Sequence, residues 1–367
     1  MSDANGSACS QAPQALLDEW IANARRAALL PRVAAQAQRV KKGATPSEVV
    51  FEEDHIKLLH YLPGAGPGDG KIKYRTPLIF VFALVNRPYI LDILPNKSVV
   101  SHFVKAGFDT YLIDWGVATD ADRHLTLDDY INSYLRTIVK HVSRRSGSKQ
   151  VSLLGYCMGG TMSAMFTALH QEYVRNLILL AAGIDFSTRE GLLNLWSDAN
   201  VFDVDSFVDE LGNCPADFLQ GCFQMLSPVR NLFGKPLTLM ERMDDEKFLE
   251  EFLTMENWIN DNVPVPGEVF RDFVKSLYQQ NMLVKNQMRV GRETVDLRRI
   301  TCPVLNLLAS QDTLVPATQS EPFTELVGST DKETIELATG HIGLAMGSAA
   351  QRELWPKSVA WLAERSN

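Results

Sequence analysis

The chain contains 367 residues, of which 46% are hydrophobic and 22% charged, and its 36 basic and 44 acidic residues give a net charge of −8. This length predicts about two domains, or one large α/β domain with an insertion. The acidic balance argues against a general nucleic-acid-binding surface, and five scattered cysteines argue against a disulfide framework. Without a signal-peptide pattern or an apolar run near the ~20 residues of a spanning helix, we expect a cytoplasmic protein with no transmembrane segment.

The N-terminal segment 1–47 combines a helical pattern with an excess of positive charge. Residues 14–42 place apolar side chains at helical spacing, interrupted at Pro31, and carry six basic and two acidic side chains. We expect an amphipathic helical segment that folds back on the body of the protein. A docking surface for a partner is the alternative interpretation.

Strand patterns begin near residue 48 and then alternate with helical patterns. The stretch 48–61 has strand character, and the Gly/Pro-rich stretch 63–70 predicts a hairpin turn or loop. Four apolar runs have the length of strands buried on both faces: 77–85, 109–115, 150–155 and 176–183. This alternation predicts βαβ units with right-handed crossovers, and therefore a mostly parallel, doubly wound α/β sheet.

The alternation stops after Gly183. The residues that follow are helical in period, and a strand pattern returns at 302–310 before a closing helix. We therefore predict a helical cap, or lid, inserted into the sheet domain. The predicted organisation is an N-terminal helical segment at 1–47, a core formed by 48–184 and 295–367, and a cap at 185–294.

The sequence Gly155-Tyr156-Cys157-Met158-Gly159 lies between a predicted buried strand and a predicted helix. This is the setting of the G-x-S-x-G nucleophile elbow of α/β-hydrolases, here with cysteine in place of serine. The glycines permit a sharp strand-to-helix turn in which larger side chains would collide, and the helix N-terminus favours a thiolate. We predict an α/β-hydrolase fold with Cys157 as nucleophile, with an ordinary buried cysteine as the alternative.

A cysteine nucleophile requires a base, and the base requires an orienting group. In α/β-hydrolases these follow in the order nucleophile, acid, histidine. Asp312 comes directly after the late strand pattern, and His341 lies in a glycine-flanked loop before the closing helix, so we predict them as acid and base. Asp114 competes as the acid, but capping of the turn that follows it explains this residue better. The six other histidines all precede Asp312.

The oxyanion hole should combine two backbone N–H groups. One comes from Met158, directly after the nucleophile, and the other from the loop after an early strand, where Val85 or Asn86 is the candidate. That loop contains no HGGG motif.

Neither a metal site nor a bound cofactor is predicted. Cys214 and Cys222 have no histidine nearby, Cys302 opens a strand, and no C-x-x-C pair occurs. No glycine-rich dinucleotide or P-loop motif is present either.

A cysteine elbow suits acyl transfer from a thioester to a hydroxyl. Exchange between a CoA thiol and a protein thiol keeps a thioester on both sides, whereas transfer to an alcohol forms the more stable oxygen ester. Water must be excluded, or the acyl-enzyme hydrolyses, and the predicted cap would serve this purpose.

Several segments resemble one family in the same order along the chain. They are ALVNRPYILDILP at 83–95, YLIDWG at 111–116, ADRHLTLDDYINSY at 121–134, LGYCMGGT at 154–161, MENWI at 255–259, ITCPVLNLLASQDTLVP at 300–316 and TGHIG at 339–343. From about residue 45 onward, the chain is similar to the catalytic subunit (PhaC) of two-component poly(3-hydroxyalkanoate) synthases. Its length and segment 121–134 look most like class III, whereas the Tyr-Cys-Met core of the elbow is closer to class IV.

This resemblance implies an acyltransferase that polymerises (R)-3-hydroxyacyl-CoA, typically 3-hydroxybutyryl-CoA, and releases CoA. It implies that Cys157 carries the growing chain, that His341 is the general base, and that Asp312 orients His341 or helps to activate the hydroxyl. It also implies a homodimer, a second subunit of the PhaE or PhaR type, and a location on the surface of a cytoplasmic polyester granule. CoA enters as part of the substrate, so no resident cofactor is expected.

Three positions bear on the resemblance. The family often has histidine after the acid, where this chain has Thr313, and a glycine pair before the catalytic histidine, where it has Thr339-Gly340. Trp258 matches a family tryptophan associated with the site or a subunit contact, but core packing explains it equally well.

Two alternative functions differ in their products. A CoA thioesterase or ester hydrolase of the same fold would release free hydroxy acid. A non-catalytic granule-binding protein would release no CoA.

Overall fold

The computed structural model describes residues 42–63 and 70–367, together with residues 21, 24, 26, 28–33 and 35. The chain divides into two compact units. Unit 1 combines residues up to Lys41 with Ser227–Asn260, and unit 2 combines Lys42–Leu226 with Asp261–Asn367.

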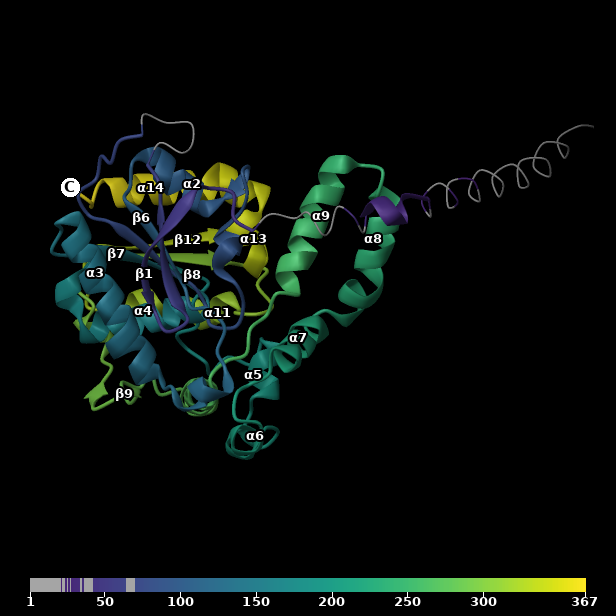
Figure 1. The fold of residues 1–367 in the computed structure, drawn as a ribbon. Helices are drawn as coiled ribbons and strands as arrows, with labels where there is room; N and C mark the ends of the chain where they lie inside the picture. Colours follow the sequence, from purple (N-terminus) through teal and green to yellow (C-terminus); the bar gives the residue numbers. More distant parts are fainter. Residues whose placement is uncertain are drawn as a thin grey trace, which may run out of the picture. The chain divides into compact units, whose positions relative to one another are not determined.

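Unit 2 is built on an eight-stranded sheet (Figure 1) with the strand order β1-β2-β6-β3-β7-β8-β11-β12. The strands are β1 (Ser47–Glu53), β2 (Ile56–Tyr61), β3 (Leu78–Val81), β6 (Thr110–Asp114), β7 (Val151–Tyr156), β8 (Val174–Leu180), β11 (Val304–Ala309) and β12 (Lys332–Leu337). β2 is antiparallel to both of its neighbours, and every other pairing in the sheet is parallel.

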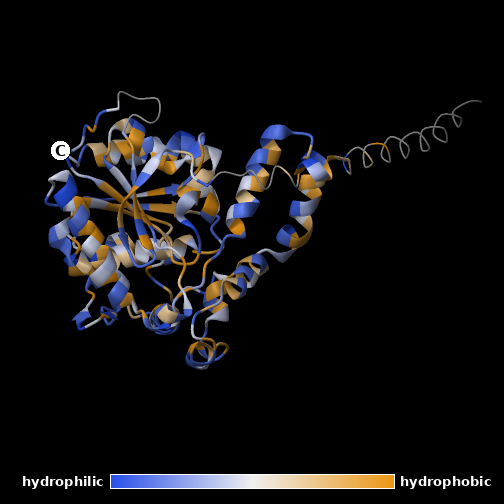
Figure 2. Cartoon of the chain, in the orientation of Figure 1, coloured by the Kyte–Doolittle hydropathy of each residue, from blue (hydrophilic) through white to orange (hydrophobic). Residues whose placement is uncertain are grey.

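Helices cover both faces of this sheet, as predicted for a doubly wound fold. Figure 1 shows α2 (Val99–Ala106) and α14 (Trp355–Ala363) on one face, and α3 (Arg136–Ser146) and α4 (Met158–Leu169) on the other. The central strands β3, β7 and β11 are buried along their whole length, and Figure 2 shows the sheet as mostly hydrophobic. Burial on both faces explains why these strands are continuous apolar runs rather than alternating patterns.

Shorter elements connect this framework. The 3-10 and π turns of unit 2 are η1 (Pro88–Leu91), η2 (Asp120–His124), η3 (Asp129–Leu135), η4 (Gln171–Tyr173), η6 (Phe273–Gln279), η7 (Leu297–Arg299) and η8 (Ala350–Leu354). Its remaining helices are α5 (Leu192–Trp196), α6 (Val204–Leu211), α7 (Ala216–Met225), α10 (Gly267–Asp272), α11 (Ala317–Ser320), α12 (Phe323–Leu326) and α13 (His341–Met346). Two small antiparallel pairs complete it, β4 (Asp92–Leu94) with β5 (Lys97–Ser98) and β9 (Arg289–Val290) with β10 (Glu293–Thr294).

Unit 1 contains η5 (Arg230–Gly234), α8 (Lys235–Arg242) and α9 (Glu246–Ile259). A small hydrophobic cluster holds it together, formed by Val33, Met243, Leu249 and Leu253. An ion pair between Lys235 and Glu256, 2.7 Å apart, joins α8 to α9.

The segment predicted as a cap, residues 185–294, contains helices α5 to α10 and ends in the β9–β10 pair. Its middle part, Ser227–Asn260, belongs to unit 1, and the parts on either side belong to unit 2.

The hairpin turn of the first two strands differs from its predicted place. The chain turns at Asp54 and His55, inside the stretch read as strand, so that β1 and β2 pair directly. Asp54 adopts the left-handed conformation with φ 54°, which aspartate tolerates in tight turns. Of the predicted turn at 63–70, residues 64–69 lie outside the described part of the chain.

Much of the predicted N-terminal segment also lies outside the described residues. The described residues between 21 and 35 are helical, whereas residues 42–46 are not.

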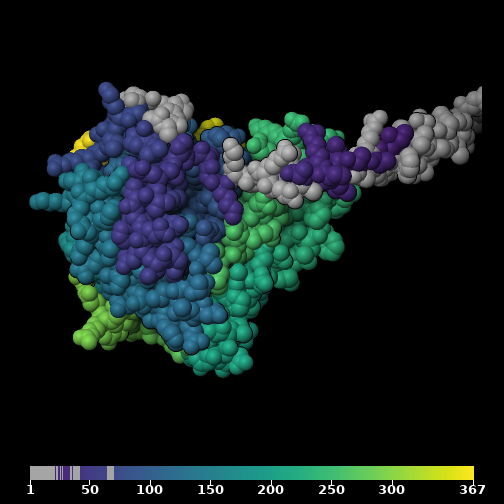
Figure 3. Space-filling model, in the orientation of Figure 1, coloured from purple at the N-terminus to yellow at the C-terminus, as the bar shows by residue number. Residues whose placement is uncertain are grey.

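The edge strand β1 is largely exposed, and its purple atoms lie with those of β2 on the face of unit 2 seen in Figure 3. Glu48, Glu52 and Glu53 place negative charge along it, which opposes pairing with a strand of another molecule. In the described part of the chain, every helix is too short or too polar to cross a bilayer.

Trp355 provides a test of the packing between α14 and α2. It is fully buried, and its ring meets that of Phe103 edge to face with centroids 6.3 Å apart. We expect Trp355→Ala to lower the free energy of unfolding by about 3–5 kcal/mol, because it leaves a large cavity. Val201→Ala, at a side chain that is 71% exposed, should change it by about 0.5 kcal/mol or less. Urea unfolding measures both, and equal effects would contradict this packing.

Candidate active site

Cys157 lies at the turn between β7 and α4, with φ 56° and ψ −126°. The packing of the two flanking glycines explains how this conformation is held. A Cβ on Gly155 would lie 2.5 Å from the Gly160 Cα, and a Cβ on Gly159 would lie 2.3 Å from the Val81 carbonyl oxygen. The backbone N–H of Cys157 donates to the Leu180 carbonyl at 2.9 Å. The sharp strand-to-helix turn predicted from the sequence is therefore present.

Asp312 and His341 are joined by a short hydrogen bond, with 2.6 Å between His341 Nδ1 and Asp312 Oδ2. Asp312 lies three residues after β11, and its Oδ1 accepts the backbone N–H groups of Leu314 (2.8 Å) and Val315 (2.9 Å). These contacts fix the carboxylate and leave its second oxygen for the imidazole. Sequence reasoning placed His341 in a loop before the closing helix; instead it is the first residue of α13, and α14 follows.

The imidazole of His341 also lies close enough to the sulfur of Cys157 for the two groups to interact electrostatically. The structure thus brings Cys157, His341 and Asp312 together in series, although they are far apart in sequence. The imidazole also stacks on the ring of Tyr156, with centroids 5.0 Å apart, and the Tyr156 hydroxyl donates to the His341 carbonyl at 3.1 Å. The Tyr156 contacts were not anticipated from the sequence.

The environment of His341 favours its protonated form. Burial by itself lowers the pKa, since only 10% of the side chain is exposed. The negative charges of Asp312 and Cys157, together with the hydrogen bond from Asp312, outweigh burial and raise the pKa of His341 to about 10. This is the electrostatic arrangement of an imidazolium held between two acidic groups.

The two predicted oxyanion donors lie beside Cys157. Met158 is the first residue of α4, so its N–H has no acceptor within the helix. Val85 lies in the bend that follows β3, which ends at Val81 rather than continuing to residue 85 as predicted. Both residues line the same cavity as Cys157.

This cavity, of about 280 Å³, lies within unit 2 and is almost entirely apolar. Aromatic side chains dominate its wall: Phe186, Trp196, Phe202, Phe218, Phe223, Phe270, Phe273 and Tyr278. The ring of Phe186 packs edge to face against that of Tyr278, with centroids 4.7 Å apart. Sequence reasoning missed these wall residues; the only signal was the aromatic content of the helical segment, which does not reveal which face points inward.

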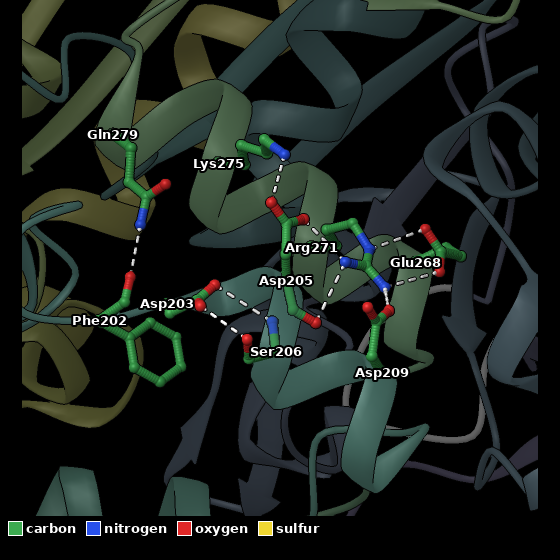
Figure 4. A network of polar contacts seen from close by, with 9 residues as sticks. All are labelled: Phe202, Asp203, Asp205, Ser206, Asp209, Glu268, Arg271, Lys275 and Gln279. Atoms are coloured by element: carbon green, nitrogen blue, oxygen red, sulfur yellow. Dashed lines mark hydrogen bonds and ion pairs between the residues drawn. The ribbon is translucent and has the colours of Figure 1, made fainter.

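A network of charges ties α6 to α10 and η6 (Figure 4). The guanidinium of Arg271 bonds Asp205 (2.7 Å), Asp209 (2.6 Å) and Glu268 (3.1 Å), and Lys275 also bonds Asp205. One arginine therefore neutralises carboxylates from two separate helices and holds them together.

The competing acid, Asp114, does not join the site. Its Oδ1 accepts the N–H of Gly116 at 3.0 Å, and its Oδ2 lies 3.2 Å from Arg87 Nη2. This is the turn-capping role expected for it. Among the other histidines, His60 pairs with Asp109 at 2.8 Å.

Three of the four remaining cysteines, and Trp258, lie in the described part of the chain. Cys214 and Cys302 are buried, and Cys222 lines the cavity. No cluster of three or more metal-binding side chains occurs among the described residues. Trp258 is buried on α9 in unit 1.

Comparison with known proteins first defines the class. A model of the alpha/beta hydrolase fold matches residues 77–346. A solved structure from Sulfolobus solfataricus, assigned as a lipase candidate, aligns with a TM-score of 0.52 and 14% identity, covering 88% of this chain and 98% of that one. Together with the sheet order, these matches confirm the predicted α/β-hydrolase fold, here with a cysteine in the nucleophile elbow.

The particular family follows from closer relatives. Residues 22–103 match the model of the poly-beta-hydroxybutyrate polymerase (PhaC) N-terminus. The poly(3-hydroxyalkanoate) polymerase subunit PhaC of Haloferax mediterranei is 43% identical, over 93% of this chain and 69% of the relative. The corresponding PhaC subunit of Allochromatium vinosum is 40% identical, over 90% of this chain and 91% of the relative. The chain belongs to the poly(3-hydroxyalkanoate) polymerase (PhaC) family, which confirms the resemblance drawn from its motifs.

The raised pKa of His341 predicts a pH-dependent stability. Above the ordinary histidine pKa of about 6.5, the unfolded chain has lost a proton that the folded chain keeps until about pH 10. The stabilisation is therefore complete below about pH 6.5 and is lost as the pH rises towards 10. Urea unfolding across this range should show the parent losing stability relative to His341→Gln. If the stability of the parent and that of His341→Gln changed with pH in parallel, the raised pKa of His341 would be contradicted.

The network around Arg271 should respond to salt. We expect Arg271→Met to destabilise the α6 region by on the order of 1 kcal/mol at low ionic strength and by less in high salt. Hydrogen exchange of the α6 amides measures this. Arg352→Met is the matched control, because Arg352 pairs with its exposed neighbour Glu353. Equal exchange in both variants would show that the network does not hold α6.

Proposed function

We propose that this chain polymerises (R)-3-hydroxyacyl groups, 3-hydroxybutyryl foremost, from their CoA thioesters into a polyester and releases CoA. The observation that carries the proposal is the series Cys157–His341–Asp312 beside an apolar cavity, in a chain of the PhaC family. A thiol nucleophile accepts an acyl group from CoA by thioester exchange at little cost in free energy, which suits repeated loading.

Before the first half-reaction, the proton of Cys157 already lies on His341, whose pKa is raised to about 10, and Asp312 orients the ring and stabilises this imidazolium. The Cys157 sulfur attacks the thioester carbonyl of the substrate. The N–H groups of Met158 and Val85 stabilise the oxyanion that forms. When the C–S bond to CoA breaks, the imidazolium protonates the leaving CoA thiolate, and the acyl group remains on Cys157 as a thioester.

In the second half-reaction, the 3-hydroxyl of another 3-hydroxyacyl-CoA attacks this thioester. His341 accepts the hydroxyl proton, an oxygen ester forms, and Cys157 leaves as a thiolate paired with the imidazolium, which restores the starting state. The chain, now one unit longer and attached to CoA, returns to Cys157 by the same thioester exchange. Each cycle releases one CoA, and the conversion of a thioester to an oxygen ester drives it forward.

The aromatic wall of the cavity supports the transfer to a hydroxyl rather than to water. An apolar cavity favours an aliphatic polyester chain and disfavours water, which would hydrolyse the acyl-enzyme. The chemistry uses only side chains and backbone N–H groups, so the proposal includes no resident cofactor.

The assembly completes the proposal. The resemblance to two-component synthases supports a homodimer of this chain together with a second subunit of the PhaE or PhaR type. We place the complex on the surface of a cytoplasmic polyester granule, where the product accumulates.

The test is to incubate the purified protein with 3-hydroxybutyryl-CoA, with and without a partner subunit, and to measure free CoA thiol, polyester and free 3-hydroxybutyrate together. We expect CoA release with polyester. CoA release with free 3-hydroxybutyrate and no polyester would indicate the thioesterase alternative, and no CoA release would contradict both enzymatic functions.

Cys157→Ala should abolish CoA release, with a loss of at least about 10³-fold, because the attacking sulfur is absent. Cys302→Ala is the matched control. Cys302 is buried two residues before β11, rather than opening the strand as predicted, and burial raises the pKa of its thiol to about 11, so it does not act as a nucleophile. Full activity of Cys157→Ala would refute the assigned nucleophile.

A further inference from the structure

A short strap, residues 262–265, crosses unit 2 between the oxyanion loop and the cavity wall. At one end, the Val263 N–H donates to the carbonyl of Val85 at 3.3 Å, and Asn86 and Asn262 form an antiparallel bridge. At the other end, Val265 and Cys214 exchange two backbone hydrogen bonds, of 2.9 and 3.0 Å. The strap therefore touches the loop that supplies one proposed oxyanion donor.

Side-chain amides continue this connection. Asn86 Nδ2 donates to Asn262 Oδ1 at 2.9 Å, and Asn262 Nδ2 donates to Gln220 Oε1. Asn86 Oδ1 accepts the N–H of Arg87 at 2.6 Å. Asn86 is buried, with 8% exposed, so its amide requires partners within the protein. Gln220 belongs to α7, whose neighbouring residues Leu219 and Phe223 line the cavity.

We propose that Asn262 is a positioning residue for the oxyanion hole. Its amide holds the side chain of Asn86, and thereby fixes the orientation of the peptide groups on either side of Val85. The backbone hydrogen bond from Val263 to Val85 fixes the distance between the oxyanion loop and the strap. A second contact is needed to prevent the loop from rotating about this bond. This inference rests on the proposed function, because it assigns Asn262 a role in stabilising the acylation transition state.

The strap has anchors that do not depend on the Asn262 side chain. Asp261, directly before it, accepts the Tyr89 hydroxyl at 2.9 Å and pairs with Lys42, and Val265 is held by its two backbone bonds. A variant that lacks the Asn262 amide should therefore fold, with the strap in place and the oxyanion loop less restrained.

Two reagents distinguish a positioning role from a general structural one. Butyryl-CoA acylates Cys157 through an oxyanion but lacks the hydroxyl needed for extension, so the reaction stops at the acyl-enzyme. Iodoacetamide alkylates the same sulfur by displacement of iodide, without an oxyanion. Peptide mass spectrometry follows both reactions at Cys157 separately from the other cysteines.

We expect Asn262→Ala to slow acylation by butyryl-CoA by about tenfold or more, with its rate of alkylation within about twofold of the parent. Asn86→Ala should have the same effect, and the double variant should be little worse than either single one, because both substitutions remove the contact between Asn86 and Asn262. Asn200→Ala is the matched control, since this exposed amide bonds Asp198; it should leave both rates unchanged.

Three results would overturn the inference. Equal acylation rates in the parent and Asn262→Ala would remove the positioning role. Equal losses in acylation and alkylation would assign Asn262 to general folding of the site. If Cys157 of the parent takes up no acyl group while it is still alkylated, the proposed function fails, and this inference fails with it.

Discussion

The left-handed backbone at Cys157 is the constraint on which the rest of the site depends. A non-glycine residue at φ 56° is strained, and here close packing of the elbow against β3 and α4 holds it in place. The same turn places the sulfur at the start of a helix and beside His341. The strained backbone, the start of the helix and the imidazole therefore all act on the sulfur of Cys157. None of the three would activate this sulfur without the other two.

Around this atom, the sheet and the segments between its strands supply different parts of the chemistry. The loop after β11 and the start of α13 bring Asp312 and His341 together at 2.6 Å. The helices inserted after β8 supply the aromatic wall of the cavity. The fold of the sheet is shared with a structure of only 14% identity, whereas the inserted helices shape the apolar cavity in which we propose that the polyester chain grows.

The sequence was sufficient to predict the elbow, the order of acid and base, and the central strands, because each has a local signature. Gly155 and Gly159 mark the turn, and apolar runs mark strands buried on both faces. β12 was not predicted, because its sequence KETIEL has exposed charges and no apolar run; its parallel pairing with β11 makes it a strand. The contact between Asn86 and Asn262 joins residues 176 positions apart, and no local pattern reveals such a pair.

The most direct test of the central claim is to look for the acyl group on the sulfur of Cys157 itself. The protein is incubated briefly with 3-hydroxybutyryl-CoA, quenched in acid and digested. The mass of the peptide that contains Cys157 is then measured by mass spectrometry. We predict that this peptide carries one or more 3-hydroxybutyryl units, which hydroxylamine removes as expected for a thioester. CoA release with an unmodified Cys157 and the acyl group on another residue would contradict it.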